Sequence, residues 1–398
     1  MTTLLKNGNI DIYIVDGVIT AVGNDALGIQ IADTVIDCTG FTVIPGICDI
    51  HVHLRDPGQT HKEDLISGAN AAAAGGVTAI VCMPNTKPTI DMPELVQDIV
   101  ERSASVKVKI YPCAAITKGL KGEELSNTAD FRALKKAGAV AVSDDGMPVA
   151  NAQMMLGAME FANEAELMVI SHCEDLNLID TRMSENTVTV RDVNFAYLLN
   201  APVHIAHVST KEAVNYIRKE KRRGAPVSCE VAPHHFTLTL NELLKRDADY
   251  KMNPPLRRED DITALIEALC DGTVDCIASD HAPHAPSEKI DFESAPNGVL
   301  GLETILSVTL TQLYHTGKLS LEKIVELLCV NPRRILGIEG GKLEPGSPAD
   351  IAVVDLNEEW IVEPDRLHSK SRNTCFKEMK LKGRVKYTLV DGKVVFKF

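Results

Sequence analysis

The amino-acid sequence predicts an α/β fold: a TIM-type (β/α)8 barrel with a small β-sandwich formed by both chain ends. Three observations support this. Apolar, strand-like runs alternate with helical stretches in the middle of the chain, both ends contain short β-like runs, and 398 residues exceed what one hydrophobic core usually serves. We therefore expect residues 1–45 plus 346–398 to form the β-sandwich domain and residues 46–345 to form the barrel domain.

Both chain ends have the pattern of a small sheet. Turn residues such as Asp16-Gly17 separate apolar runs of strand length at residues 10–15, 18–22 and 35–38. Similar runs return after a Pro- and Gly-containing stretch, at residues 351–354, 385–389 and 393–396. Asp391-Gly392 between the last two runs is a strong hairpin signal. Because both ends are rich in strands, we expect them to meet beside the barrel.

The middle of the chain repeats a strand-then-helix pattern. One apolar run ends in His53, and further runs of strand length occupy residues 77–83, 106–115, 139–142, 167–170, 203–206, 227–231 and 274–278. Helical stretches lie between most of them, for example at residues 63–74, 94–102, 152–165 and 211–223. Eight strands in this order favour a closed parallel barrel, in which reactive residues gather at the carboxyl ends of the strands.

Composition and charge exclude several classes of protein. The sequence has no apolar run of about 18 residues and no signal-peptide pattern at its start, so we expect a cytoplasmic protein with no membrane partner. The ten cysteines include no C-x-x-C pair, which favours reduced thiols. The net charge of −14 argues against a nucleic-acid partner, and it means that an anionic substrate would need locally placed cations.

The most informative segment is the end of the first barrel strand, where His51 and His53 stand two residues apart. Side chains alternate between the two faces of a strand, so these imidazoles point the same way and can hold one metal ion between them. The apolar run before them indicates a buried strand, and Pro57-Gly58 ends it. A ligand pair in this position is expected of a barrel enzyme.

Residues that can bind a metal recur at the other predicted strand ends. Together with His51 and His53, eight of the twelve histidines lie at strand ends. Because these ends converge on one mouth, residues distant in sequence become neighbours. Histidine nitrogens and carboxylate oxygens without a thiolate suit zinc or a similar divalent ion in a catalytic site. The remaining residues of this set are Asp144, Asp145, His172, His207, His234, His235, Asp280, His281 and His284.

Some histidines have simpler expected roles. His204 lies on the opposite strand face from His207, so we expect it to pack against a helix. His234 and His235 are expected to support the ligands rather than to bind metal. His281 is expected to face away from the ligand side of its strand.

These motifs resemble those of a known family. The His51-Val52-His53 pair, single histidines at two later strand ends and Asp280 at the last strand resemble the metal-dependent amidohydrolase superfamily. Within it, the chain is similar to the dihydroorotase family, which reversibly cyclises N-carbamoyl-L-aspartate to L-dihydroorotate in pyrimidine (UMP) biosynthesis. The resemblance covers nearly the whole chain and rests on motifs at residues 53–58, 83–86, 253–257, 279–284 and 346–350.

The resemblance implies one or two Zn²⁺ ions per chain. His51 and His53, with Asp280 adjacent, would bind the first ion. His172 and His207 would bind the second.

The resemblance also implies a ligand that bridges the two ions. Many superfamily members use a carboxylated lysine at the end of strand four, but Lys135 and Lys136 precede that strand here. The resemblance therefore implies the branch in which an aspartate takes the bridge. Strand alternation does not choose between Asp144 and Asp145, whereas the family pattern, with Gly146 following, favours Asp145.

The resemblance also implies a site for a small anionic substrate. Asp280 would act as the catalytic proton shuttle. Arg55 would grip a carboxylate bidentately, the alternative being a surface ion pair with Asp56 or Glu63. For Asn85 and Asn253, which lie beside proline, the alternative is a role in the turn. The remaining substrate-binding positions are His53, Asn85, Asn253, His284, Asn297 and Gly298.

Two other functions compete with this one. A cyclic amidohydrolase of the allantoinase or hydantoinase type would use the same metals, but it would not need the set Arg55, Asn85 and His284, and it usually carries the strand-four lysine. An inactive dihydroorotase-like scaffold that binds aspartate transcarbamoylase would typically have lost metal ligands, and here all are intact.

We also expect a homodimer and allow for an association with aspartate transcarbamoylase. The segment between His172 and His207 looks shorter than in many relatives, which concerns packing and oligomer contacts rather than the ligands.

Overall fold

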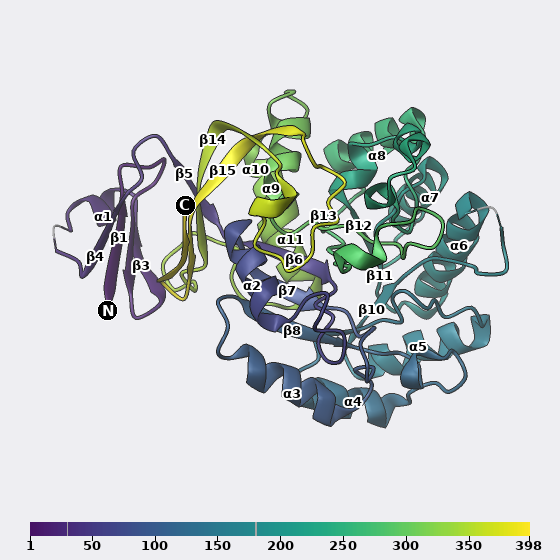
Figure 1. Cartoon of the computed structure of the whole chain (residues 1–398). Coiled ribbons are helices and arrows are strands. Elements are labelled where there is room, and N and C mark those ends of the chain that lie inside the picture. The colour runs from purple at the N-terminus through teal and green to yellow at the C-terminus, as the bar shows by residue number, and fades with distance from the viewer. Residues whose placement is uncertain (30, 180) are drawn as a thin grey trace.

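Eight parallel strands form the barrel at the centre of the molecule, and they pair in the order of the sequence (Figure 1). They are β6 (Ile47–Val52), β7 (Val77–Cys82), β8 (Lys109–Ala114), β9 (Ala141–Val142), β10 (Met168–Ser171), β11 (Val203–Ile205), β12 (Val227–Val231) and β13 (Cys276–Ile277). The computed structural model describes residues 1–29, 31–179 and 181–398. The His53 amide donates to the His281 carbonyl at 2.8 Å, which brings the first and last strand ends together. The predicted (β/α)8 barrel is confirmed.

Helices cover the outside of the barrel (Figure 1). Those between successive strands are α2 (Leu65–Ala74), α3 (Pro93–Ser103), α4 (Thr128–Ala137), α5 (Ala152–Glu164), α6 (Thr181–Leu199), α7 (Lys211–Arg222) and α8 (Glu259–Asp271). After β13 come α9 (Ile305–Thr309), α10 (Leu321–Val325) and α11 (Asn331–Leu336), and the short α1 (Asn24–Leu27) lies near the N-terminus. Helix α2 begins two residues later than predicted because Asp64 accepts the amide of Ser67 and serves as the N-cap.

The core has two layers. Ile50, Val81, Cys113 and Ile170 belong to a cluster that fills the inside of the barrel. A larger apolar cluster lies between the strands and the surrounding helices. Strands that are buried on both faces explain why the apolar runs in the sequence are nearly continuous.

Two four-stranded sheets lie beside the barrel (Figure 1). One contains β1 (Thr2–Lys6), β2 (Ile12–Val15), β3 (Val18–Val22) and β4 (Thr34–Asp37); the other contains β5 (Thr42–Pro45), β14 (Ile351–Ile361), β15 (Lys380–Val390) and β16 (Lys393–Lys397). Both chain ends therefore contribute, because β5 pairs with β14 and a shared core includes Leu5, Ile14, Ile351 and Leu389. β14 and β15 extend beyond the predicted runs, since cross-strand pairs such as Trp360 with Leu381 continue the ladder past polar residues.

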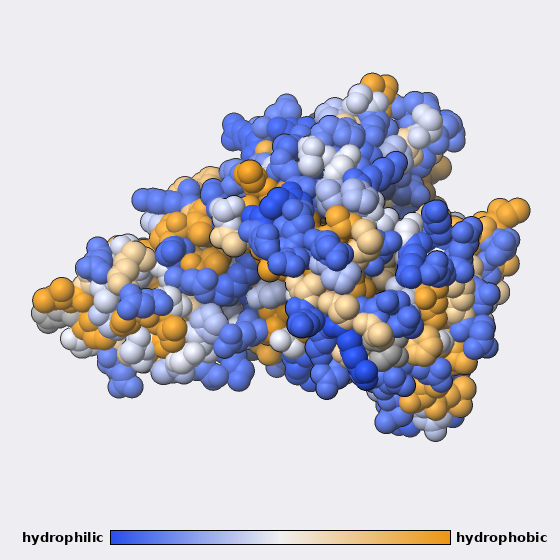
Figure 2. Space-filling view, turned by 90° about the horizontal axis from the view of Figure 1, so that it is seen from below, coloured by the Kyte–Doolittle hydropathy of each residue, from blue (hydrophilic) through white to orange (hydrophobic). Residues whose placement is uncertain are grey.

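The surface is mainly hydrophilic. On the face shown in Figure 2, apolar residues form separate patches, several of them at the end occupied by the N-terminal sheet. Val18 and Val35 are among the exposed apolar residues of that sheet. Within the described ranges, no helix has the length and apolar character needed to cross a membrane.

Candidate metal centre and substrate pocket

The carboxylate of Asp145 lies at the centre of the predicted ligand cluster. Its oxygens are close to ring nitrogens of four histidines, at 3.2 Å from His51, 3.3 Å from His53, 3.1 Å from His172 and 3.5 Å from His207. Asp145 follows β9, whereas the histidines come from the carboxyl ends of β6, β10 and β11. The barrel thus brings together residues that are far apart in sequence.

Asp280 approaches the same cluster from the end of β13. Its Oδ1 lies 3.3 Å from Nε2 of His53 and 3.7 Å from Nε2 of His51. The φ angle of Asp280 is +49°, a conformation uncommon outside glycine and typical of constrained functional sites.

Asp144, the alternative to Asp145, points away from the histidines. Its carboxylate accepts the backbone amide of Ile116 at 2.7 Å and that of Thr117 at 3.0 Å. These contacts give Asp144 a structural role in the neighbouring loop. The geometry therefore favours Asp145 as the ligand.

The donor set of the cluster suits a divalent metal ion. Nε2 of His51 is buried and has no hydrogen-bond partner among the described residues. Ligand atoms of His51, His53 and Asp280 lie within 4.8 Å of one another, and so do those of His51, Asp145 and His207. Nitrogen and carboxylate donors without cysteine fit zinc or a similar ion.

Opposite charges dominate the electrostatics of the cluster. Burial alone would lower the pKa of His51, but Asp145 and Glu230 raise it well above its usual value. Burial disfavours the charged forms of Asp145 and Asp280, yet the surrounding histidines lower the pKa of both carboxyl groups. Both carboxylates are therefore ionised at neutral pH, and the site attracts positive charge.

A cavity of about 200 Å³ opens beside the cluster, and all the predicted substrate-binding residues line it. Its walls come from seven strand ends or the loops that follow them, so the site depends on the whole barrel mouth. The lining residues are His53, Arg55, Asn85, Asp145, Gly146, His172, His207, Asn253, Asp280, Ala282, His284, Asn297 and Gly298.

Arg55 supplies an unpaired cation to this pocket. Its Nε donates to a backbone carbonyl at 3.1 Å, and no carboxylate of the described residues lies within ion-pair distance. The alternative ion pairs do not form: Asp56 pairs with Arg102 at 2.9 Å, and Glu63 accepts the hydroxyl of Ser369. Burial lowers the pKa of Arg55 to about 10, so the guanidinium is still charged at neutral pH.

Two of the three predicted asparagines each contact a polar side chain of the site. Asn85 Oδ1 accepts from Nδ1 of His53 at 2.8 Å, which leaves Nε2 of that ring facing the cluster. Asn253 Nδ2 donates to Glu174 at 3.0 Å, and the same Glu174 oxygen lies 3.1 Å from Nε2 of His172. Both asparagines therefore do more than shape a turn beside proline.

The loop that follows β13 forms one wall of the pocket. Nε2 of His284 donates to the Asn297 carbonyl at 2.9 Å, and burial, with Arg55 nearby, lowers the pKa of His284 to about 3, so the ring is neutral. Gly298 has a φ angle of +138°, and a Cβ atom here would lie 2.7 Å from the carbonyl oxygen of Ala282. Glycine alone fits without moving the loop.

Comparison with known proteins identifies the family. Residues 42–395 match the amidohydrolase family. The chain belongs to this family. Relatives of this amidohydrolase include the dihydroorotases of Geobacter metallireducens and Acetivibrio thermocellus, each 45% identical to it over 98% of this chain and 95% of the relative. Similar solved structures include an L-hydantoinase (dihydropyrimidinase) from Arthrobacter aurescens, with a TM-score of 0.92 and 26% identity over 100% of this chain and 96% of that chain. A dihydropyrimidinase from Brevibacillus agri matches with a TM-score of 0.89 and 24% identity over 100% and 95% of the two chains.

Sequence reasoning missed a buried carboxylate beneath the candidate ligand cluster of this amidohydrolase. Glu230 on β12 accepts from Nδ1 of His51 at 2.7 Å, and its other oxygen lies 3.2 Å from Nε2 of His204. The expectation that His204 packs against a helix is therefore wrong. Its ring lies inside the barrel, with Nδ1 2.8 Å from Ser228, because β11 and β12 place these residues on the same inner face. The available signal was a glutamate inside an apolar strand.

Asn373, from the segment between β14 and β15, was also missed. It is buried, and its Nδ2 donates to the carbonyls of Ala282 at 3.1 Å and Gly298 at 3.0 Å. Its Oδ1 accepts the His284 amide at 3.1 Å. Asn373 therefore ties together two parts of the pocket wall, although nothing in its sequence neighbourhood signals this.

Three further histidines of the predicted strand ends lie outside the candidate ligand set. Nδ1 of His281 accepts the Gly301 amide at 3.2 Å, and its Nε2 lies 3.5 Å from Glu63, so the ring faces away from the cluster as predicted. His234 and His235 are buried against each other, with ring centroids 4.3 Å apart. In the described chain, neither belongs to a group of residues able to hold a metal.

Proposed function

We propose that this amidohydrolase is a dihydroorotase, which reversibly cyclises N-carbamoyl-L-aspartate to L-dihydroorotate in pyrimidine biosynthesis. The observation that carries the proposal is the unpaired guanidinium of Arg55 in a pocket shared with the metal-ligand cluster. Dihydroorotate has both features that such a pocket can use, a carboxylate and a hydrolysable ring amide. The dihydroorotases that match at 45% identity over nearly the full length support the same function.

We further propose that one or two Zn²⁺ ions bind in the cluster, His51, His53 and Asp280 holding one and His172 and His207 the other. When bound, zinc makes water a nucleophile at neutral pH and polarises a carbonyl group. The orientation of His51 and His53 supports this assignment, because each gives its Nδ1 to a neighbouring acceptor and turns Nε2 towards the carboxylates.

We also assign the chain to the dihydroorotases in which an aspartate replaces the carboxylated lysine. The contacts of Asp145 with histidines of both proposed metal groups support this, while Lys135 lies at the surface, 2.7 Å from Glu166. Asp145→Asn should therefore remove more bound zinc than Asp144→Asn. Equal metal contents, measured by atomic emission, would contradict the assignment.

In the proposed mechanism, the side chains of the chain bind the substrate and transfer protons. Arg55 holds the substrate carboxylate with two N–H donors, and Asn253 with the backbone near Gly298 binds the ring amides. Asp280 accepts a proton from the attacking water as the amide C–N bond breaks, and it passes that proton to the departing ring nitrogen. In the synthetic direction Asp280 takes the proton from the carbamoyl nitrogen as the ring closes, and it passes that proton to the carboxyl oxygen that leaves as water.

A hydantoinase-type activity is the second candidate, because solved hydantoinases share the fold. Hydantoins and allantoin do not present a carboxylate for Arg55. An inactive scaffold is the third candidate, and the gathering of all six predicted ligands argues against it.

The deciding experiment is a substrate comparison. Purified, zinc-loaded protein is incubated separately with L-dihydroorotate, hydantoin and allantoin, and ring opening is followed by the fall in ultraviolet absorbance. We expect turnover of dihydroorotate that a chelator abolishes and added zinc restores. Turnover of hydantoin or allantoin alone would favour the second candidate, and no turnover of any substrate would favour the scaffold.

The homodimer and the association with aspartate transcarbamoylase stay predictions. The cytoplasmic location also stays a prediction, as does the division into two domains, residues 1–45 plus 346–398 and residues 46–345. Size-exclusion chromatography of the protein, alone and mixed with aspartate transcarbamoylase, tests the first two.

A further inference from the structure

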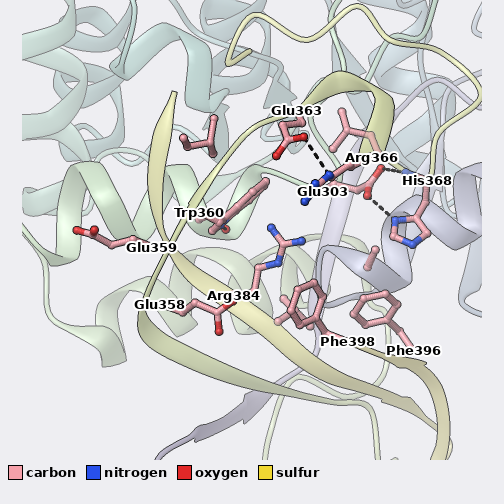
Figure 3. Close-up of a pocket in the computed structure, with 15 residues that line it drawn as sticks. Glu303, Glu358, Glu359, Trp360, Glu363, Arg366, His368, Arg384, Phe396 and Phe398 are labelled. Atoms are coloured by element: carbon pink, nitrogen blue, oxygen red, sulfur yellow. Dashed lines mark hydrogen bonds and ion pairs between the residues drawn. The ribbon is translucent and has the colours of Figure 1, made fainter. Parts of the chain in front are cut away.

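A second cavity lies where the C-terminal strands meet the outside of the barrel (Figure 3). Its volume is about 340 Å³, which is larger than that of the substrate pocket. Its walls come from β14, β15 and β16, the segment after β14, and the region around α9. None of the described residues that line it lines the substrate pocket. The volume suffices for a small organic ligand.

The guanidinium of Arg384 lies in this cavity between two aromatic rings. Its central carbon is 4.2 Å from the ring centroid of Trp360 and 4.4 Å from that of Phe398, and Figure 3 shows it between them. The N–H donors of a guanidinium lie in its plane. Aromatic rings packed on the planar group hold it in place but accept none of these donors, so its N–H edge is left for another partner.

The other charged side chains that line the cavity are already neutralised. Each has a partner of opposite charge within ion-pair distance: Glu303 with His368, Glu363 with Arg366, Glu358 with Lys386 and Glu359 with Lys380. In the described part of the chain, Arg384 makes no ion pair and donates no hydrogen bond. Among the described residues, Arg384 is therefore the charged residue of the cavity without an ion-pair partner, although Glu358 and Glu303 act on its charge from a longer distance.

We propose that this cavity is a second ligand site, and that it binds a small organic anion with a flat ring. The carboxylate or phosphate of the ligand accepts hydrogen bonds from the N–H edge of Arg384, a planar geometry that guanidinium groups favour. The ring packs against the apolar wall, which includes Phe396 and Leu367. Aromatic carboxylates and nucleoside monophosphates both have this chemistry.

Trp360 makes the proposal directly testable, because it is the only tryptophan of the chain. Its fluorescence therefore reports on this cavity and not on the substrate pocket. The titrants are UMP and benzoate, which combine a ring with a phosphate or a carboxylate, and uridine and inorganic phosphate, which each lack one of the two parts. We expect UMP or benzoate to change the emission with a Kd of about 1 mM or tighter, and uridine and phosphate to bind at least about tenfold more weakly.

Variants of Arg384 identify the anchor. Arg384→Gln should weaken binding at least about tenfold, and Arg384→Lys, which keeps the charge but not the planar fork, should lie between it and the wild type. The matched control is Arg246→Gln, since Arg246 also lies over an aromatic ring, that of Phe292, but is paired with Glu293 at the surface. The control should bind as the wild type does.

Three results would overturn the proposal. The first is an emission that neither UMP nor benzoate changes, and the second is binding that survives Arg384→Gln. The third is an emission that depends on protein concentration and on no titrant, which would mean that a second copy of the chain covers the cavity. If the Arg384 variants do not fold, crystals of the wild type soaked separately in UMP and in benzoate decide the matter. Density for either ligand against Arg384 supports the proposal, and the absence of both there contradicts it.

Discussion

The carboxylate of Glu230 lies beneath the metal-ligand cluster, 2.7 Å from Nδ1 of His51. By accepting the proton of that nitrogen, it fixes the tautomer in which Nε2 is free to bind a metal. We expect Glu230→Gln to lower zinc affinity by about 10- to 100-fold, which competition with a coloured chelator measures. The matched control is Glu220→Gln, because Glu220 is equally buried but pairs with Arg223 on the outside of the barrel. Equal losses of affinity in the two variants would contradict the role of Glu230.

Arg55 allows binding of the substrate to be separated from binding of the metal. Its side chain lines the pocket but belongs to none of the three groups of described residues that could hold a metal. We expect Arg55→Gln to lower kcat/KM by about 100-fold through a higher KM, because about 3 kcal/mol of charged hydrogen bonding to the substrate is lost. Zinc content should equal that of the wild type. Steady-state kinetics together with metal analysis check both parts, and an unchanged KM would exclude carboxylate binding by Arg55.

At the scale of secondary structure, the strand ends were predictable and the supports behind them were not. In a parallel barrel the carboxyl ends of the strands converge regardless of the conformation of the loops. The residues at those ends could therefore be placed together from the sequence alone. Glu230 was missed because a single inward-facing glutamate in an apolar strand has no motif, and its role depends on the register of β11 and β12. Asn373 was missed because its contacts join segments about 75 to 90 positions apart along the chain.

The loop after β13 forms part of the pocket wall, and at Gly298 it packs too closely against Ala282 to leave space for a side chain. Gly298 and Gly272 both have positive φ angles, but a Cβ atom would clash with a backbone oxygen only at Gly298 and would meet open space at Gly272. Alanine at either position should cost about 1–2 kcal/mol of stability for the backbone conformation alone. We expect Gly298→Ala to raise KM as well, because the loop must move, and Gly272→Ala to leave KM unchanged. Thermal melts and kinetics of the two variants provide the comparison, and equal KM values would show that the loop tolerates the side chain.

At the scale of the whole molecule, the terminal segments and the barrel form one functional unit. The segment between β14 and β15 leaves the terminal sheet, contacts Glu303 and the buried Glu63, and reaches the wall of the substrate pocket through Asn373. The overall charge of −14 also explains the need for Arg55, because an acidic protein needs a local cation to hold an anionic substrate. Activity should therefore depend on residues that are remote in sequence from the barrel strands.

Metal binding should couple the stability of the molecule to pH. Burial alone would lower the pKa of His172, but Asp145 and Glu174 raise it to about 10 in the metal-free protein. A histidine in the unfolded chain titrates near about 6.5, so the folded, metal-free protein holds this proton more tightly. The resulting stabilisation is fully present below about pH 6.5 and is lost as the pH rises towards about 10. Zinc must displace the proton from His172, so its affinity should increase with pH, by about tenfold per unit for each proton released.

Thermal melts between about pH 7 and about pH 9, with free zinc held constant by a chelator buffer, measure this coupling. The gain in Tm on adding zinc should grow across that interval, because the metal replaces a stabilising proton that the metal-free protein is losing. Asp145→Asn should remove most of the gain at every pH, since it takes away the carboxylate that contacts both proposed groups of metal ligands. A gain in Tm that shrinks as the pH rises would mean that zinc binds without displacing protons from these histidines.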